Sequence, residues 1–188
     1  PIALVTGSNG KTTTVRLLAA MCAEDGRVPG YNCTDGVFVG TEMLEQGDWS
    51  GPAGARCVLR DRRVESAILE TARGGLLRRG LAVAHADAAI VTNISADHFG
   101  EYGIHSLADL AQAKLVVSRA IGPEGLLVLN ADDPELVAAS AGLRMRTGWF
   151  SLEERNPFLL AARADGMPAC APHEGRLWLW DAHEEFDL

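Results

Sequence analysis

Short apolar runs alternate with longer segments of helical periodicity along most of this chain. The predicted strands are 2–6, 66–69, 87–92 and 125–129, each a compact apolar run. The predicted helices are 11–23, 52–59, 106–121 and 134–141. Pro52 suits a first helical turn, and Ser106 with Asp109 fits a capping box. Repeated strand–helix units imply a mostly parallel sheet with helices on both faces.

Two stretches depart from this alternation. Residues 31–49 are rich in Gly, Thr and Asp with alternating apolar positions, which predicts turns and a small hairpin. After Trp149 the pattern weakens, and 167–171 with 176–180 are predicted to form an antiparallel pair. The predicted fold is therefore α/β, with a phosphate-loop NTPase-like, mostly parallel sheet and a small antiparallel portion.

Composition narrows the class of protein. A length of 188 residues suits one domain, predicted to span 1–188. The formal charge of −8 gives no general attraction to nucleic acid or to anionic membranes. The four cysteines lie far apart without metal-site spacing, which favours free thiols in a cytoplasmic protein. Because Pro1 runs directly into a predicted core strand, we expect the chain to be a fragment.

The first chemical motif is Gly7-Ser8-Asn9-Gly10-Lys11-Thr12-Thr13, between the first strand and the first helix. Such a loop directs backbone N–H groups and a helix dipole at an anion. Lys11 is expected to reach the outer phosphates of a nucleotide, and the Thr12 hydroxyl to ligate Mg²⁺. Val5 stands where the common form of the motif has its first glycine. The alternative is an ordinary tight turn between a strand and a helix.

Polar residues follow three further strands. Glu70 ends one strand and is a candidate Mg²⁺ ligand, although a strand-end glutamate can also be a solvated surface residue. The segment 93–98 follows the next strand and includes Asn93 and His98. Its Asp97-His98 pair alone could be structural. Because carboxyl ends of parallel strands share one edge, we expect all these groups at one site.

Three more residues are candidates for the same site. Lys114 interrupts an apolar helical stripe, so it either extends to water or is held near the site, where a modification could remove its positive charge. Asn130 and Asp132 follow the fourth strand and are expected to approach the nucleotide. Asp133, just before Pro134, is expected to cap a helix.

Taken together, these residues resemble the central, ATP-binding domain of the Mur ligases. The resemblance rests on Thr-Gly-Ser-Asn-Gly-Lys-Thr-Thr at 6–13, Glu70, Asn93 through Asp97-His98, Lys114, and Asn-Ala-Asp-Asp at 130–133. Order and spacing agree until about Trp149. Within the family, segments 34–36, 51–61 and 69–78 are most similar to the ligase half of the cyanophycin synthetases.

The resemblance implies ATP-dependent amide formation through an acyl phosphate, with Lys11, Glu70, His98 and Lys114 as catalytic residues. Thr12 and Glu70 would hold one Mg²⁺, and His98 a second metal, shared with Lys114 if that lysine is carbamylated. The residues expected to contact ATP are Gly7, Ser8, Asn9, Gly10, Lys11, Thr12, Thr13, Asn93, Asn130 and Asp132. In cyanophycin synthetases the amine is arginine and the carboxylate is an aspartate side chain of the polymer.

Members of the family also have a C-terminal domain for the amine substrate, and cyanophycin synthetases have an upstream portion. Neither is in this sequence, so we expect the isolated chain to be inactive and those domains to be its partners. Three alternatives remain: another Mur-type ligase with a cell-wall or folate-like substrate, a phosphate-loop NTPase that acts as a switch or motor, and a non-catalytic binding module.

Overall fold

The computed structural model describes residues 1–96, 100, 103–182 and 184–188. Its strands are β1 (Ile2–Thr6), β2 (Pro29–Cys33), β3 (Gly36–Val39), β4 (Glu42–Gln46), β5 (Ser66–Glu70), β6 (Ala86–Val91), β7 (Ile121–Asn130), β8 (Thr147–Phe150), β9 (Ala169–His173), β10 (Arg176–Asp181) and β11 (Glu184–Asp187). Its helices are α1 (Lys11–Glu24), α2 (Pro52–Arg60), α3 (Arg73–Arg79), α4 (Leu107–Leu115), the 3₁₀ helix η1 (Val116–Ala120), α5 (Pro134–Ser140) and α6 (Pro157–Ala164). None of these helices is long and apolar enough to cross a membrane.

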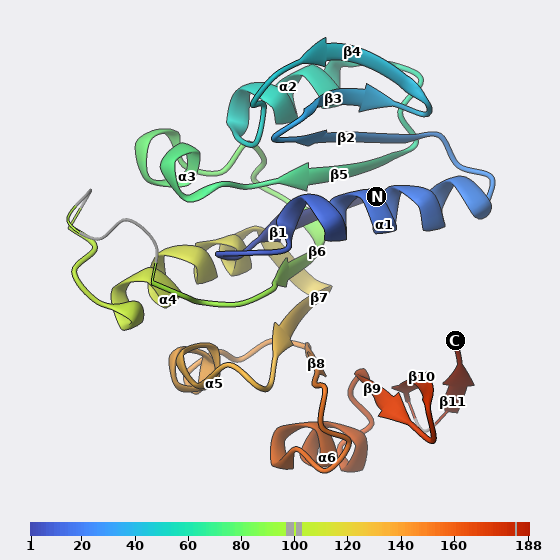
Figure 1. Ribbon diagram of the computed structural model, residues 1–188, viewed down its shortest axis with the longest axis vertical. Helices are drawn as coiled ribbons and strands as arrows, with labels where there is room; N and C mark the ends of the chain where they lie inside the picture. The colour runs from blue at the N-terminus through green and yellow to red at the C-terminus, as the bar shows by residue number, and fades with distance from the viewer. Residues whose placement is uncertain (97–99, 101–102, 183) are drawn as a thin grey trace.

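The described strands form one sheet in the order β11-β10-β9-β8-β7-β6-β1-β5-β2-β3-β4 (Figure 1). Neighbours from β9 to β2 run parallel. Both ends of the sheet are antiparallel, through β2–β3–β4 on one side and β9–β10–β11 on the other. The predicted α/β fold with a mostly parallel sheet is therefore confirmed.

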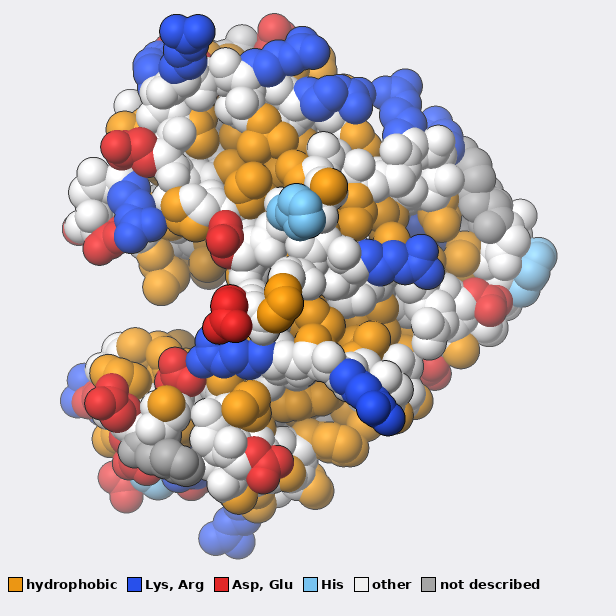
Figure 2. All heavy atoms as spheres, turned by 180° about the vertical axis from the view of Figure 1, so that it is seen from behind, with side chains coloured by type: hydrophobic (Ala, Val, Ile, Leu, Met, Phe, Trp, Pro, Cys, Tyr) orange, Lys and Arg blue, Asp and Glu red, His pale blue; other side chains and the backbone are white. Residues whose placement is uncertain are grey.

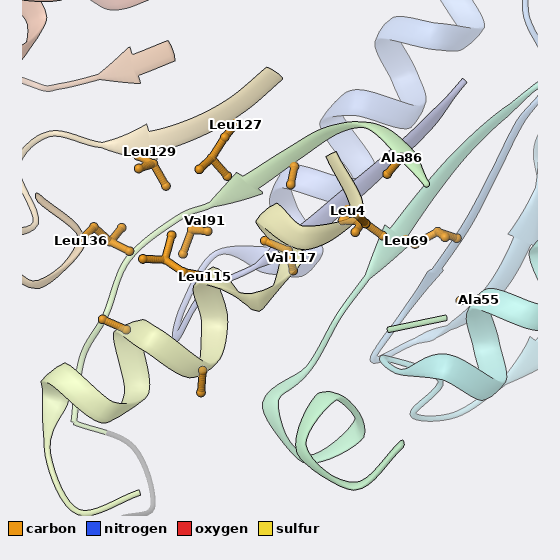
Figure 3. Packing of buried hydrophobic residues seen from close by; sticks show 14 of the residues in the cluster. Leu4, Ala55, Leu69, Ala86, Val91, Leu115, Val117, Leu127, Leu129 and Leu136 are labelled. Atoms are coloured by element: carbon orange, nitrogen blue, oxygen red, sulfur yellow. The ribbon is translucent and has the colours of Figure 1, made fainter. Parts of the chain in front are cut away.

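Helices cover both faces because alternate residues of the central strands point to opposite sides. Leu4 of β1 and Leu69 of β5 pack in a core with residues of α2, α4 and α5. Figure 3 shows this layer, with side chains from β1, β5, β6 and β7 facing those of the helical segments. Val5 and Ile68 point the other way, toward Val15 and Ala19 of α1. Burial on both faces explains why these strands are continuous apolar runs.

The predicted helix at 106–121 is shorter in the structure. The capping box of Ser106 and Asp109 is confirmed, but the α-helix ends at Leu115 and a 3₁₀ helix follows. Strand β7 begins at Ile121. Pro123 disfavours helical geometry at Gly122, which fits the end of the helical region at Ala120 but does not explain the change to a 3₁₀ helix at Val116.

Several elements were not predicted. The segment 31–49 holds β3, β4 and most of β2, where only one small hairpin was expected. Helix α3 contains Gly74 and Gly75, which disfavour helix. A Cβ at Gly75 would lie 2.8 Å from Pro52 Cδ, so packing against α2 requires the glycine. The acidic segment 184–187 is the exposed edge strand β11.

Candidate functional site

The predicted clusters of polar residues meet at one edge of the sheet. Strands β7, β6, β1 and β5 are parallel neighbours, so their carboxyl ends lie side by side. The chain leaves this edge at the left of Figure 1, where α3, α4 and α5 begin. The loop before α1, Glu70, Asn93 and Asn130 all belong to these strand ends. The described groups of the prediction therefore share one edge, whereas Asp97 and His98 lie outside the described residues.

The loop from Gly7 to Gly10 is shaped for a close approach of backbone to a ligand. Gly7 has φ 143° and Gly10 has φ 81°, values that favour glycine. A Cβ at Gly7 would lie 1.9 Å from Thr92 Oγ1. Gly10 caps α1 without any side-chain hydrogen bond. The N–H groups of the first helical turn therefore remain available to an anion, since no earlier turn accepts them.

Asn93 holds this loop in place. Its Oδ1 accepts from Asn9 N at 2.9 Å, and its Nδ2 donates to Asn9 O at 3.1 Å. Ser8 N also donates to Asn93 O at 2.9 Å, and Thr92 Oγ1 donates to Asn9 O at 2.6 Å. The Asn93 amide and two of the loop N–H groups are thus used within the protein. Asn93 shapes the loop in this structure, while its predicted contact with ATP stays a prediction.

Glu70 and Thr12 form the polar centre of the site. Thr12 Oγ1 donates to Glu70 Oε2 at 2.8 Å, and only 1% of Glu70 is exposed. Burial raises the pKa of Glu70 above its ordinary value, and the Thr12 hydrogen bond and nearby Lys11 oppose that rise. Glu70 Oε1 is buried and has no hydrogen-bond partner among the described residues. Glu70 is therefore not the solvated surface residue of the alternative interpretation.

Lys11 lies over the loop. Its Nζ donates to Ser8 O at 2.9 Å, so the ammonium lies beside the backbone that precedes α1. Opposite charge on Lys11 also favours the ionised form of Glu70, whose pKa it lowers. The cation, the open helix N-terminus and the buried carboxylate are brought together by the turn between β1 and α1.

Lys114 and His98 are the predicted ligands of a second metal, and the structure describes only the first of them. Only 2% of Lys114 is exposed, so its side chain does not extend to water. It lies in α4, in the helical stripe with the buried Leu110 and Val117. His98 lies outside the described residues. The described residues contain no cluster of three or more His, Cys, Asp or Glu that could hold a metal.

The polar residues at the end of β7 and just after it make hydrogen bonds that connect separate segments of the protein. Asn130 Nδ2 donates to Thr92 O at 3.1 Å. The carboxylate of Asp132 accepts from Ser151 Oγ, Leu152 N and Asn156 Nδ2. Asp133 Oδ1 caps α5, as predicted, and its Oδ2 accepts from Ile94 N at 2.5 Å. The predicted contacts of Asn130 and Asp132 with ATP stay predictions.

A groove of about 460 Å³ between α2 and α3 was not predicted. It is lined by Asp48 to Gly54 on one side and by Ala72, Gly74, Gly75, Arg78 and Arg79 on the other. Ala72, which lines the groove, is two residues beyond Glu70, so the groove lies next to the carboxyl end of β5. Figure 2 shows Lys and Arg side chains along the upper rim of the molecule, the part to which α2 and α3 belong in Figure 1. The sequence signal for this groove was the pairs Gly51-Pro52 and Gly74-Gly75, because glycine permits two backbones to approach closely.

Comparisons with known proteins show the family of this chain. The profile described as Mur ligase middle domain matches residues 5–168. A cyanophycin synthetase of Geminocystis herdmanii is 43% identical over 170 residues, which are 90% of this chain and 20% of that protein. This chain therefore spans about a fifth of the length of that relative.

Solved structures agree in fold. A UDP-N-acetylmuramoyl-L-alanyl-D-glutamate–2,6-diaminopimelate ligase matches with a TM-score of 0.72 and 19% identity, over 100% of this chain and 38% of that chain. A bifunctional folylpolyglutamate synthase/dihydrofolate synthase, solved with Mn, AMPPNP and L-glutamate bound, matches with a TM-score of 0.65 and 16% identity, over 98% of this chain and 48% of that chain. With the profile match over most of its length, the chain belongs to the Mur ligase family, as a middle domain.

Proposed function

We propose that this chain is the ATP-binding domain of a ligase that forms an amide bond through an acyl phosphate, with Lys11, Glu70, His98 and Lys114 as catalytic residues. A substrate carboxylate attacks the γ-phosphate of ATP, ADP leaves, and an amine then displaces phosphate. The observation that carries the proposal is the buried Glu70 carboxylate beside Thr12, at the start of the helix that follows the phosphate loop.

The described residues fit a divalent cation at this point. Glu70 Oε1 is a buried carboxylate oxygen without a hydrogen-bond partner among the described residues, and hard cations prefer oxygen ligands. Thr12 and Glu70 would hold Mg²⁺, which when bound offsets the negative charge of the phosphates and the attacking carboxylate. The folylpolyglutamate synthase with Mn and AMPPNP bound supports the pairing of a divalent cation with a nucleotide in this fold.

The protein groups act by position and charge. The ammonium of Lys11 and the N–H groups at the start of α1 stabilise the transferring phosphoryl group, because they are already oriented toward it. Asn93 keeps the loop in the shape that these N–H groups require. A reducing cytoplasm is the proposed compartment, in keeping with four free cysteines.

The proposed substrates are an aspartate side-chain carboxylate and arginine as the amine. Identity of 43% to a cyanophycin synthetase supports this pair, and so does the arginine-lined groove beside Glu70, which suits an acidic acceptor. In this proposal 1–188 is one middle domain, and the amine is held by segments outside it. The alternative is another Mur-type ligase with a cell-wall or folate-like substrate.

An assay of phosphate release tests the proposed function. In the full-length protein with ATP and Mg²⁺, we expect release to require both an aspartyl-terminated acceptor and arginine. Parallel reactions with cell-wall precursors and folates, each with its amine, identify a different Mur-type activity. Release that needs neither a carboxylate nor an amine contradicts the proposal and favours an NTPase switch.

Lys114 is proposed to act as a carbamate, since an ammonium repels a cation whereas a carbamate binds one. We expect Lys114→Ala to lower activity about 10- to 100-fold and small carboxylates to restore part of it. Gln112→Ala, on the exposed side of α4, is the matched control and should leave activity unchanged. Full activity of a folded Lys114→Ala variant would show that the proposed role is wrong.

A further inference from the structure

The two-residue turn between β2 and β3, Thr34 and Asp35, lies against the first turn of α1. Thr34 Oγ1 is 3.0 Å from Thr12 Oγ1. Asp35 Oδ2 accepts from Arg16 at 2.7 Å, one helical turn further along α1. Two successive side chains of the turn therefore contact two residues on one face of the helix. The contact brings a loop from another part of the sheet to the proposed cation ligand.

Proton counting decides the direction of the threonine contact. Thr12 has one hydroxyl proton and donates it to Glu70 Oε2 at 2.8 Å. When Glu70 is ionised, as a carboxylate that binds a cation is, the hydrogen bond between the two threonines is donated by Thr34. A hydroxyl oxygen has two lone pairs, and Thr34 occupies one of them on Thr12. The second lone pair is left for a cation, and its direction is set by the other two bonds.

The turn is held independently of these side chains. Cys33 O accepts from Trp49 N at 3.0 Å, and Asp35 O accepts from Gly47 N at 3.1 Å. Thr34 is thus presented by a backbone that is anchored on both sides. Its exposed hydroxyl needs no partner in the protein, because water can satisfy it. Its contact with Thr12 is therefore not required to satisfy the Thr34 hydroxyl.

From this geometry we propose that Thr34 is a positioning residue, which orients the Thr12 hydroxyl so that Thr12 and Glu70 present their oxygens to one divalent cation. The inference rests on the proposed function, in which Thr12 and Glu70 hold that cation. It adds a residue from the β2–β3 turn to the site. Its role is carried through Thr12, as outer-shell hydrogen bonds orient the ligands of a metal.

The test measures cation-dependent nucleotide binding rather than turnover. Mn²⁺ is titrated into the full-length protein with a non-hydrolysable ATP analogue, and bound Mn²⁺ is followed by electron paramagnetic resonance. Thr34→Val keeps the shape and removes the hydroxyl, and we expect it to weaken Mn²⁺ binding about 10-fold or more. Thr34→Ser keeps the hydroxyl and should stay within about twofold of the unaltered protein.

Asp35→Asn is the matched control on the same turn. It removes an exposed ion pair, whose side chains are 53% and 50% exposed, and exposed pairs contribute little. Asp35 is also the smallest of the charges that act on Glu70, so we expect Mn²⁺ binding by this variant to change far less than in Thr34→Val. Equal losses in Thr34→Val and Thr34→Ser, or a loss in Asp35→Asn as large as in Thr34→Val, would assign the turn a structural role and overturn the proposal.

The two proposals fail in different ways. If the unaltered protein binds no Mn²⁺ with the nucleotide analogue, the proposed cation site itself is wrong. If the unaltered protein binds both and Thr34→Val binds them equally well, only the role of Thr34 is wrong. Thermal unfolding without cation should differ little between Thr34→Val and the unaltered protein, which separates lost ligand orientation from lost folding.

Discussion

Replacing Lys11 with methionine is expected to lower nucleotide-dependent phosphate release about 10²- to 10³-fold, the cost typical of removing one oriented group that stabilises transition-state charge. Methionine keeps much of the side-chain length and removes the ammonium. The effect should fall on turnover more than on folding, since the hydrogen bond that Lys11 donates within the described part of the chain goes to Ser8 O of its own loop. Steady-state phosphate release and thermal unfolding, measured side by side, check both parts.

The matched control for Lys11 is Arg27→Met, which removes a cation from an exposed ion pair with Asp25 just after α1. This variant changes the net charge equally and should retain full activity, because exposed pairs contribute little and the residue is not at the loop. Activity of Lys11→Met within about tenfold of the unaltered protein would be incompatible with the electrostatic role given to the ammonium.

Replacing Glu70 with glutamine is expected to abolish cation-dependent activity and to make the cation-free protein more stable at neutral pH. Burial raises the pKa of Glu70 in the folded state, so the folded protein holds this proton more tightly than the unfolded chain. The unaltered protein therefore loses stability as pH rises from the ordinary pKa of the carboxyl to its raised folded value. Glutamine has no such proton, and the loss disappears.

We expect the gain from Glu70→Gln to appear as a higher melting temperature of the cation-free protein at neutral pH. The gain in stability should be small at low pH, where the carboxyl is protonated in both states. It should be largest above the pH range in which the carboxyl titrates. Mg²⁺ with nucleotide should stabilise the unaltered protein and not the variant. Glu45→Gln on the exposed face of β4 is the control and should show neither effect. A variant that is less stable at neutral pH would contradict the assigned pKa shift.

Local sequence determined the main strands, the phosphate loop and the helix caps. A strand buried on both faces must be a continuous apolar run, so β1, β5 and β6 were recognisable from their residues alone. The glycines and Lys11 belong to one continuous segment, and Ser106 and Asp109 lie three residues apart. The same reasoning did not predict α3. Its glycines disfavour a helix, and their presence is explained only by the packing of Gly75 against Pro52.

Tertiary structure decided how the residues of the site act on each other. Thr12, Thr34 and Glu70 come from separate segments, and only the sheet order brings β2 and β5 beside β1 and α1. Asn93 is 84 residues from Asn9, and its amide proved to hold the loop rather than to point away from it. Glu70 could not be told from a solvated glutamate until its burial was known. Motifs specify which groups are present, whereas burial and hydrogen-bond partners depend on contacts between segments far apart in the chain.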